Sequence, residues 1–170
     1  MSAFLTLRVL HILLAAILVG ATTATTLFIV PAMKDARAAG GQVMAAVGRR
    51  GYMAFMSSVS GLTTLTGIYL YWHFTSGFDP VISGSMSGRV FGTGGLAGIL
   101  VTIIGGAVVG RNAKKVAAIM EKAGPMADGA EKSALLQEAA KCQQTMATYG
   151  KISLALMVIA LVCMSVGHYL

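Results

Sequence analysis

Four long apolar runs, separated by shorter polar stretches, dominate the pattern of hydrophobic and polar positions along the chain. Each run reaches the roughly 20 residues that a helix needs to cross the hydrocarbon core of a bilayer. The predicted spans are about 4–30, which ends at Pro31, about 51–73, about 90–110 and about 148–168. The pattern therefore predicts an all-α polytopic membrane protein, with residues 1–170 forming one four-helix transmembrane bundle.

The stretch between the third and fourth spans predicts a helical hairpin outside the membrane. We expect the helix to continue from Arg111 and to break at Gly124-Pro125, because proline disrupts a helix. Helix should resume at about Ala130 and lead into the fourth span. Charges of both signs along this hairpin are typical of a solvated surface, and a partner-binding surface is the alternative interpretation.

Most basic residues fall between the spans. The 170 residues include 13 Lys and Arg against 6 Asp and Glu, a formal net charge of +7. The basic residues of the first and third connections are Lys34, Arg37, Arg49, Arg50, Arg111, Lys114, Lys115, Lys122, Lys132 and Lys141. The positive-inside rule places these connections in the cytoplasm and both termini outside. The charge thus predicts an orientation in the bacterial inner membrane, with no role for nucleic acid.

The composition excludes several other classes of protein. Apolar residues make up 56% of the chain and charged residues 11%, where a soluble domain carries about 25% charge. Cys142 is predicted inside and Cys163 within the fourth span, so the chain is not a disulfide scaffold. No span holds an acidic residue, which argues against a proton-driven transporter. No nucleotide-binding or hydrolase motif occurs either, so the sequence leaves open whether the protein is an enzyme.

Small residues recur at every fourth position of the third span, and small residues let membrane helices approach closely. They predict one contact face along that helix, formed by Gly94, Gly98, Thr102, Gly106 and Gly110. A cluster of threonines in the first span, Thr22 to Thr26, bonds most simply to its own helix. A polar path for a solute is the alternative interpretation of that cluster.

Arg8 and His11 are the sharpest chemical feature, because an ionisable residue inside a span is costly and usually functional. They lie three residues apart and so share one face of the first helix. His73 ends the second span and His168 ends the fourth, on the same predicted outer side. All three histidines are therefore expected in one leaflet, although His73 and His168 could equally be anchors at the headgroup level.

Histidine is the commonest protein ligand of metals and a usual axial ligand of haem iron. Arg8 and Arg89 lie at the predicted outer level, where a guanidinium could bind a haem propionate. Haem b is favoured over copper, because the arginines have an obvious role only with haem. For copper the softer candidate ligands are Met164 and Cys163.

The first span carries Arg8, then Leu10-His11, then Gly20, and closes at Pro31. This opening resembles that of the four-helix bacterial membrane proteins related to CopD-type copper-resistance proteins and HemJ-type protoporphyrinogen oxidases. The HemJ-type resemblance implies a haem site served by a span-one histidine, which His11 matches, and by a span-three lysine, which this chain lacks. The CopD-type resemblance implies copper uptake through histidines and methionines near the outer face.

These observations lead to one favoured function and two alternatives. The favoured function is an integral membrane protein that binds haem b, or copper, near its outer face through His11 and either His73 or His168. The first alternative is a non-catalytic accessory subunit of a larger respiratory or photosynthetic complex, and the second is a CopD-like copper transporter. The expected partners are the lipid bilayer and either further copies of the chain or such a complex.

Overall fold

The computed structural model describes residues 3–170, except for the side chains of residues 37, 38 and 45, so the side chain of Arg37 lies outside the description. The chain is 88% helical, and residues 3–170 contain no strand. The helical segments are α1 (Ala3–Ala24), the π-helical η1 (Thr25–Ile29), α2 (Val30–Asp35), α3 (Arg37–Arg49), α4 (Tyr52–Phe74), α5 (Pro80–Gly84), α6 (Met86–Ile103), the π-helical η2 (Ile104–Gly110), α7 (Arg111–Ala123) and α8 (Ala130–Val166).

Four helices are long and apolar enough to cross a membrane, which confirms the predicted number of spans. They are Ala3–Asp35, Tyr52–Phe74, Met86–Ala123 and Ala130–Val166. The second agrees closely with its predicted range. The other three extend beyond their apolar runs, because the helix continues into the polar connections.

The first helix does not end at Pro31, and this part of the prediction is wrong. Helical structure continues through Pro31 to Asp35. A proline normally clashes with the carbonyl four residues before it. Here the π-helical η1 comes first, and the Val30 N–H bonds to the Thr25 carbonyl five residues back. A π-helix has a wider turn than an α-helix, so it accommodates the proline ring without a break.

The predicted hairpin is confirmed, since α7 ends at Ala123 and α8 begins at Ala130. Its two helices bury small and apolar side chains against each other: Ile119, Ala123, Ala139 and Cys142. At the turn the hydrogen bond from Lys132, 2.8 Å from Asp128 Oδ1, lowers the pKa of that carboxyl. Polar pairing thus closes the turn while apolar packing joins the helices.

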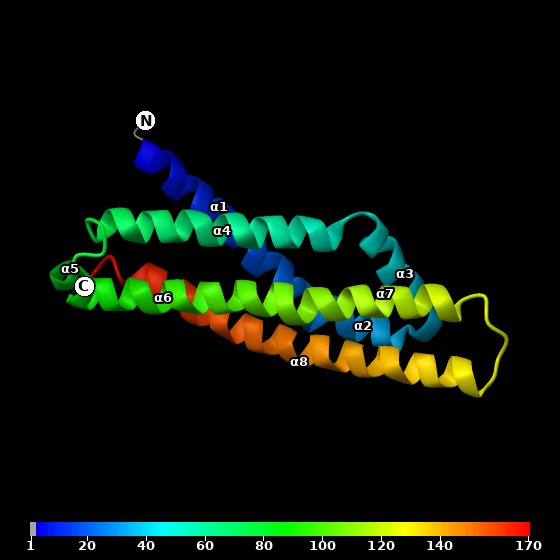
Figure 1. The fold of residues 1–170 in the computed structure, drawn as a ribbon. Helices are drawn as coiled ribbons and strands as arrows, with labels where there is room; N and C mark the ends of the chain where they lie inside the picture. The colour runs from blue at the N-terminus through cyan, green and yellow to red at the C-terminus, as the bar shows by residue number, and fades with distance from the viewer. Residues whose placement is uncertain (1–2) are drawn as a thin grey trace.

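Pairs of contacting residues show that neighbouring helices run antiparallel. Arg8 of α1 meets His168 after the end of α8, whereas Thr26, further along the first helix, lies beside Gly150, which comes earlier in α8. Within the bundle α1 packs on α4 and α8, and α6 packs on the same two helices. Helices α1 and α6 therefore occupy opposite corners of an up-and-down bundle (Figure 1).

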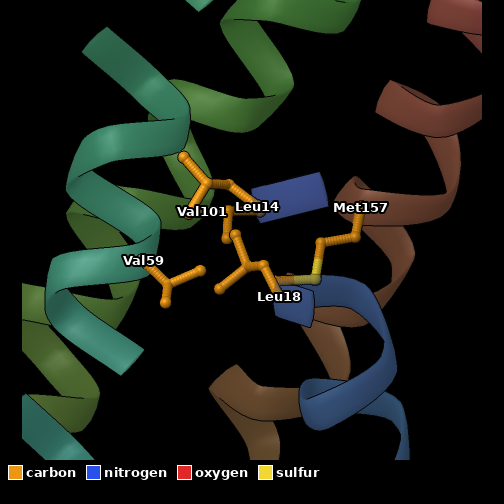
Figure 2. Packing of buried hydrophobic residues seen from close by; sticks show 5 residues of the cluster. All are labelled: Leu14, Leu18, Val59, Val101 and Met157. Atoms are coloured by element: carbon orange, nitrogen blue, oxygen red, sulfur yellow. The ribbon is translucent and has the colours of Figure 1, made fainter. Parts of the chain in front are cut away.

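The two ends of this bundle differ. Figure 1 shows α5, the start of α1 and the end of α8 at one end, which we call the terminal end. The turn from α7 into α8 lies at the opposite end, the hairpin end. A small apolar core lies between them and takes residues from all four long helices: Leu14, Leu18, Val59, Val101 and Met157 (Figure 2).

A polar link crosses the middle of the bundle beside this core. The Thr102 hydroxyl of α6 lies 2.8 Å from Ser60 Oγ and 2.7 Å from Thr64 Oγ1, both on α4. Such interhelical hydrogen bonds stabilise membrane bundles by about 0.6 kcal/mol each. These hydrogen bonds fix the axial register of α4 against α6.

The small residues of the third span do not form one contact face as predicted. A Cβ on Gly94 would lie 2.9 Å from Cys163 Cβ, whereas no described atom outside its own helix lies within 4 Å of one on Gly98 or Gly106. Residues four apart in a helix advance by about 40° around its axis, so Gly94 and Gly106 point about 120° apart. The row of small residues therefore winds away from α8.

Replacing Gly94 by Ala is expected to lower the free energy of unfolding by about 1–3 kcal/mol, because the added methyl overpacks the contact with α8. Gly98→Ala is the matched control and should change stability by less than about 0.5 kcal/mol. Reversible unfolding in mixed micelles measures both. Equal effects of the two substitutions would contradict the close approach of α6 to α8 at Gly94.

Candidate functional site

A cavity of about 190 Å³ lies at the terminal end of the bundle and is lined by all four long helices and the segment after α8. Its polar and sulfur-bearing side chains are Arg8, His11, Tyr71, Met164 and His168. Its apolar walls are Phe4, Ile12, Leu70, Phe74 and Phe91, and two glycines, Gly67 and Gly95, complete the lining. No acidic residue of the described chain lines it, so Arg8 gives the cavity a positive charge.

His11 is held at the cavity by a hydrogen bond to α4. Its Nδ1 lies 3.0 Å from the Thr63 carbonyl oxygen, which can only accept, so Nδ1 carries the proton and donates it. The opposite ring nitrogen, Nε2, has no hydrogen-bond partner among the residues that the structure describes. His11 thus offers a free nitrogen lone pair on a ring that lines the cavity.

Gly67 makes room for the His11 ring. A Cβ at this position would lie 3.0 Å from Cε1 of His11, tighter than an ordinary contact. The sequence pattern did not identify Gly67, Thr63 or Thr66 as neighbours of His11. One feature of the sequence could have pointed to these partners. An imidazole N–H inside a span needs an acceptor, and the threonine-rich second span supplies acceptors.

Arg8 and His168 meet at the mouth of the cavity. The guanidinium has only donors, so it donates to Nε2 of His168, which is therefore the unprotonated nitrogen of that ring. The His168 and Phe91 rings pack edge to face, with centroids 5.5 Å apart. His168 thus has its Nε2 lone pair occupied, unlike His11.

The helix geometry gives the depth of each donor. His11 lies three residues beyond Arg8, about 4.5 Å further along the axis of α1, and Arg8 contacts His168 at the mouth. Thr26 lies beside Gly150 of the antiparallel α8, and counting from this pair along the two helices places Met164 at about the level of His11. Its methyl group lies 3.2 Å from the position of a Cβ on Gly94. Histidine and thioether therefore line the same depth of one cavity.

Two of the five predicted site residues lie outside this cavity. His73 packs its ring on Phe4, with centroids 4.5 Å apart, and lines a separate surface hollow with Trp72, Ser76 and Gly77. It follows Thr66, the contact of His11, by seven residues and so lies about two helical turns nearer the terminal end. Arg89 is exposed in the first turn of α6 and does not line the cavity.

Within the described residues, no three His, Cys, Asp or Glu side chains lie close enough together to hold a metal ion. The side chains that could take part in holding a cofactor are His11, His168 and Met164 as donors and Arg8 as a cation. Neither a protein-family model, nor a curated protein, nor a solved structure matches the chain.

A double-mutant cycle tests the contact between Arg8 and His168. We expect Arg8→Met and His168→Phe to be coupled by about 0.5–1.5 kcal/mol, since both remove one hydrogen bond and His168→Phe keeps the ring packed on Phe91. Unfolding in mixed micelles gives the four stabilities. Additive effects within error would show that the two side chains do not interact.

Proposed function

We propose that the chain is an integral protein of the bacterial inner membrane that binds haem b at the terminal-end cavity, with His11 as principal ligand. One observation carries this proposal: Nδ1 of His11 donates to α4, so Nε2 keeps its lone pair on a ring that lines the cavity. Metal-ligating histidines almost always donate their other ring nitrogen in this way. The bound haem would supply one-electron chemistry.

The rest of the cavity fits a ligand that is mostly apolar and carries an anionic group at its edge. Aromatic and aliphatic side chains form most of its lining, and Arg8 can bind a carboxylate with two parallel hydrogen bonds. The cavity volume of about 190 Å³ is smaller than the roughly 300–1,000 Å³ of common ligand sites. The cavity is open at its edge, where Phe74 is exposed, so a ligand larger than this volume would also contact the surface around it.

His168 is the second ligand in this proposal, and Arg8 controls its availability. While Arg8 donates to Nε2 of His168, that lone pair cannot bind a metal. A ligand carboxylate is the stronger partner for a guanidinium, so its binding would draw Arg8 away and release His168. Anion recognition and metal ligation by His168 are thus coupled.

Copper is the second candidate, and Met164 favours it. The thioether lines the cavity at about the depth of His11, and a pair of imidazole and thioether donors suits Cu(I). The small volume of the cavity also suits a single ion. The CopD-type resemblance of the first span agrees with this candidate.

Replacing His11 by Ala is expected to abolish cofactor binding, because it removes the free Nε2. Protein purified from a host rich in haem and copper should show a Soret band and a pyridine haemochrome spectrum, with at least about tenfold less haem in His11→Ala. His73→Ala is the control and should retain full haem content, because His73 lies outside the cavity.

The same preparation separates the alternatives. If the wild-type protein contains copper but no haem, and both His11→Ala and Met164→Leu lose the copper, the result would support the copper candidate. Neither haem nor copper in the wild-type protein, with migration in a native gel as part of a large complex, would support an accessory subunit instead.

The proposed orientation places the terminal end outside the cell, following the positive-inside rule. We expect Tyr169→Cys, introduced into a chain without Cys142 and Cys163, to react with an impermeant maleimide on intact cells. Gly129→Cys, at the turn of the hairpin, should react only after the membrane is opened. The reverse labelling pattern would show that the bundle has the opposite orientation in the membrane and would contradict the proposal.

A further inference from the structure

We propose that the connection between α4 and α6, residues 75–85, inserts its apolar side chains into the lipid leaflet at the terminal end of the bundle. This α4–α6 connection contains the short helix α5, which packs beside the start of α6 (Figure 1). Its partner is therefore the headgroup layer of the bilayer. The insertion is a property of the chain itself and does not depend on a cofactor in the cavity.

Large apolar side chains are exposed along the connection. Val81 is 81% exposed and Phe78 is 54% exposed, and Met86, the first residue of α6, is 64% exposed. Gly77 lies against the side chain of Trp72, which is itself exposed on α4. The connection thus continues the apolar surface of the second span. Lipid removes such surface from water, which is favourable.

The connection carries little charge to oppose insertion. Residues 75–85 contain no Lys or Arg, and their only acidic residue is Asp79. The Asp79 carboxylate caps α5, since its Oδ1 accepts from the N–H groups of Val81 and Ile82 at 2.8 and 3.2 Å. The connections at the hairpin end, by contrast, hold most of the basic residues of the chain.

The backbone of the connection is also prepared for a place with little water. Every backbone N–H from Thr75 to Ser83 has an acceptor within the protein, apart from Pro80, which has no N–H. The acceptors are main-chain carbonyls and two side-chain oxygens, Thr75 Oγ1 and Asp79 Oδ1. A loop in water can leave such groups to the solvent, whereas backbone in a membrane must be satisfied by the protein.

An unusual turn after α4 combines the exposed ring of Phe78 with a paired N–H. Ser76, Gly77 and Phe78 have φ angles of 51°, 88° and 66°, a left-handed conformation that is uncommon outside glycine. The fully buried Thr75 holds this turn. Its hydroxyl donates to the Tyr71 carbonyl at 2.8 Å and accepts from the Phe78 N–H at 3.0 Å.

The length of α4 places the connection at the depth of the headgroups. Arg49 and Arg50 precede α4 and mark the opposite boundary of the membrane, and the helix begins at Tyr52. About 20 residues cross the hydrocarbon core, so the core ends near Trp72. Thr75 lies about 4.5 Å further along the axis. The headgroup layer adds roughly 5–7 Å beyond the core, so it encloses the start of the connection.

Single tryptophans in brominated lipid test this insertion, because bromine quenches tryptophan fluorescence on contact. Trp72 is the only tryptophan of the chain, so Trp72→Phe provides the background for Val81→Trp. The full-length, cofactor-free protein is reconstituted into phosphatidylcholine vesicles. Their acyl chains carry bromine either near the headgroup or near the chain end.

We expect Val81→Trp to lose more fluorescence to bromine near the headgroup than to bromine near the chain end. Leu65→Trp, exposed in the middle of α4, should show the opposite order. Gly129→Trp, at the turn of the hairpin, should lose fluorescence in neither lipid and should be quenched by aqueous iodide instead.

Fluorescence of Val81→Trp that is unchanged in both lipids, and is quenched by iodide as strongly as that of Gly129→Trp, would overturn the proposal. The same result is expected if these side chains bind a soluble protein instead, because the vesicles contain no such partner. Phe78→Trp keeps an aromatic ring at the second exposed position. It repeats the measurement, with the same two outcomes, if Val81→Trp does not fold.

Discussion

The hydrogen bond from His11 to α4 is the constraint on which the terminal end of the bundle depends. An imidazole N–H inside a bilayer needs an acceptor, and the Thr63 carbonyl supplies one at 3.0 Å. This bond fixes α1 against α4 at one level, and further along the first helix Thr25 meets Tyr52 at the start of α4. The same bond leaves Nε2 of His11 as the unprotonated nitrogen. One interaction therefore sets both the alignment of two helices and the chemistry of the cavity.

Three glycines lie in close contact with side chains at the terminal end. A Cβ on Gly67 would meet the His11 ring at 3.0 Å, one on Gly94 would meet Cys163 at 2.9 Å, and one on Gly167 would meet Phe91 at 2.8 Å. These contacts position side chains on all four sides of the cavity. The hairpin end is joined differently, through buried alanines and ion pairs such as Lys115 with Glu138, 2.7 Å apart.

The sequence predicted the four spans and the break at Gly124-Pro125, because apolar length and proline chemistry are local properties. It did not predict the passage of the helix through Pro31, which depends on the π-helical turn before it. For the site, it selected Arg8, His11 and His168, which line one cavity, together with His73 and Arg89, which do not. Which predicted residues reach the cavity depends on how far each helix is shifted along its axis relative to its neighbours. A sequence gives positions along each helix, but levels between helices follow from contacts such as that of His11 with Thr66.

Within the proposed function, charge favours haem over copper as the ligand of this cavity. Arg8 has no acidic neighbour among the residues lining the cavity, so a bound cation would add to a positive charge that nothing there offsets. Two unit charges about 5 Å apart repel by about 3 kcal/mol at an effective dielectric constant of 20. That amount is comparable to a hundredfold loss of affinity. A haem carries carboxylates, so its approach to Arg8 turns the same charge into an attraction. Copper would need Met164 and His11 to outweigh the repulsion without help from His168, whose Nε2 accepts from Arg8. In this proposal the same guanidinium would disfavour a bare cation and favour an anionic macrocycle.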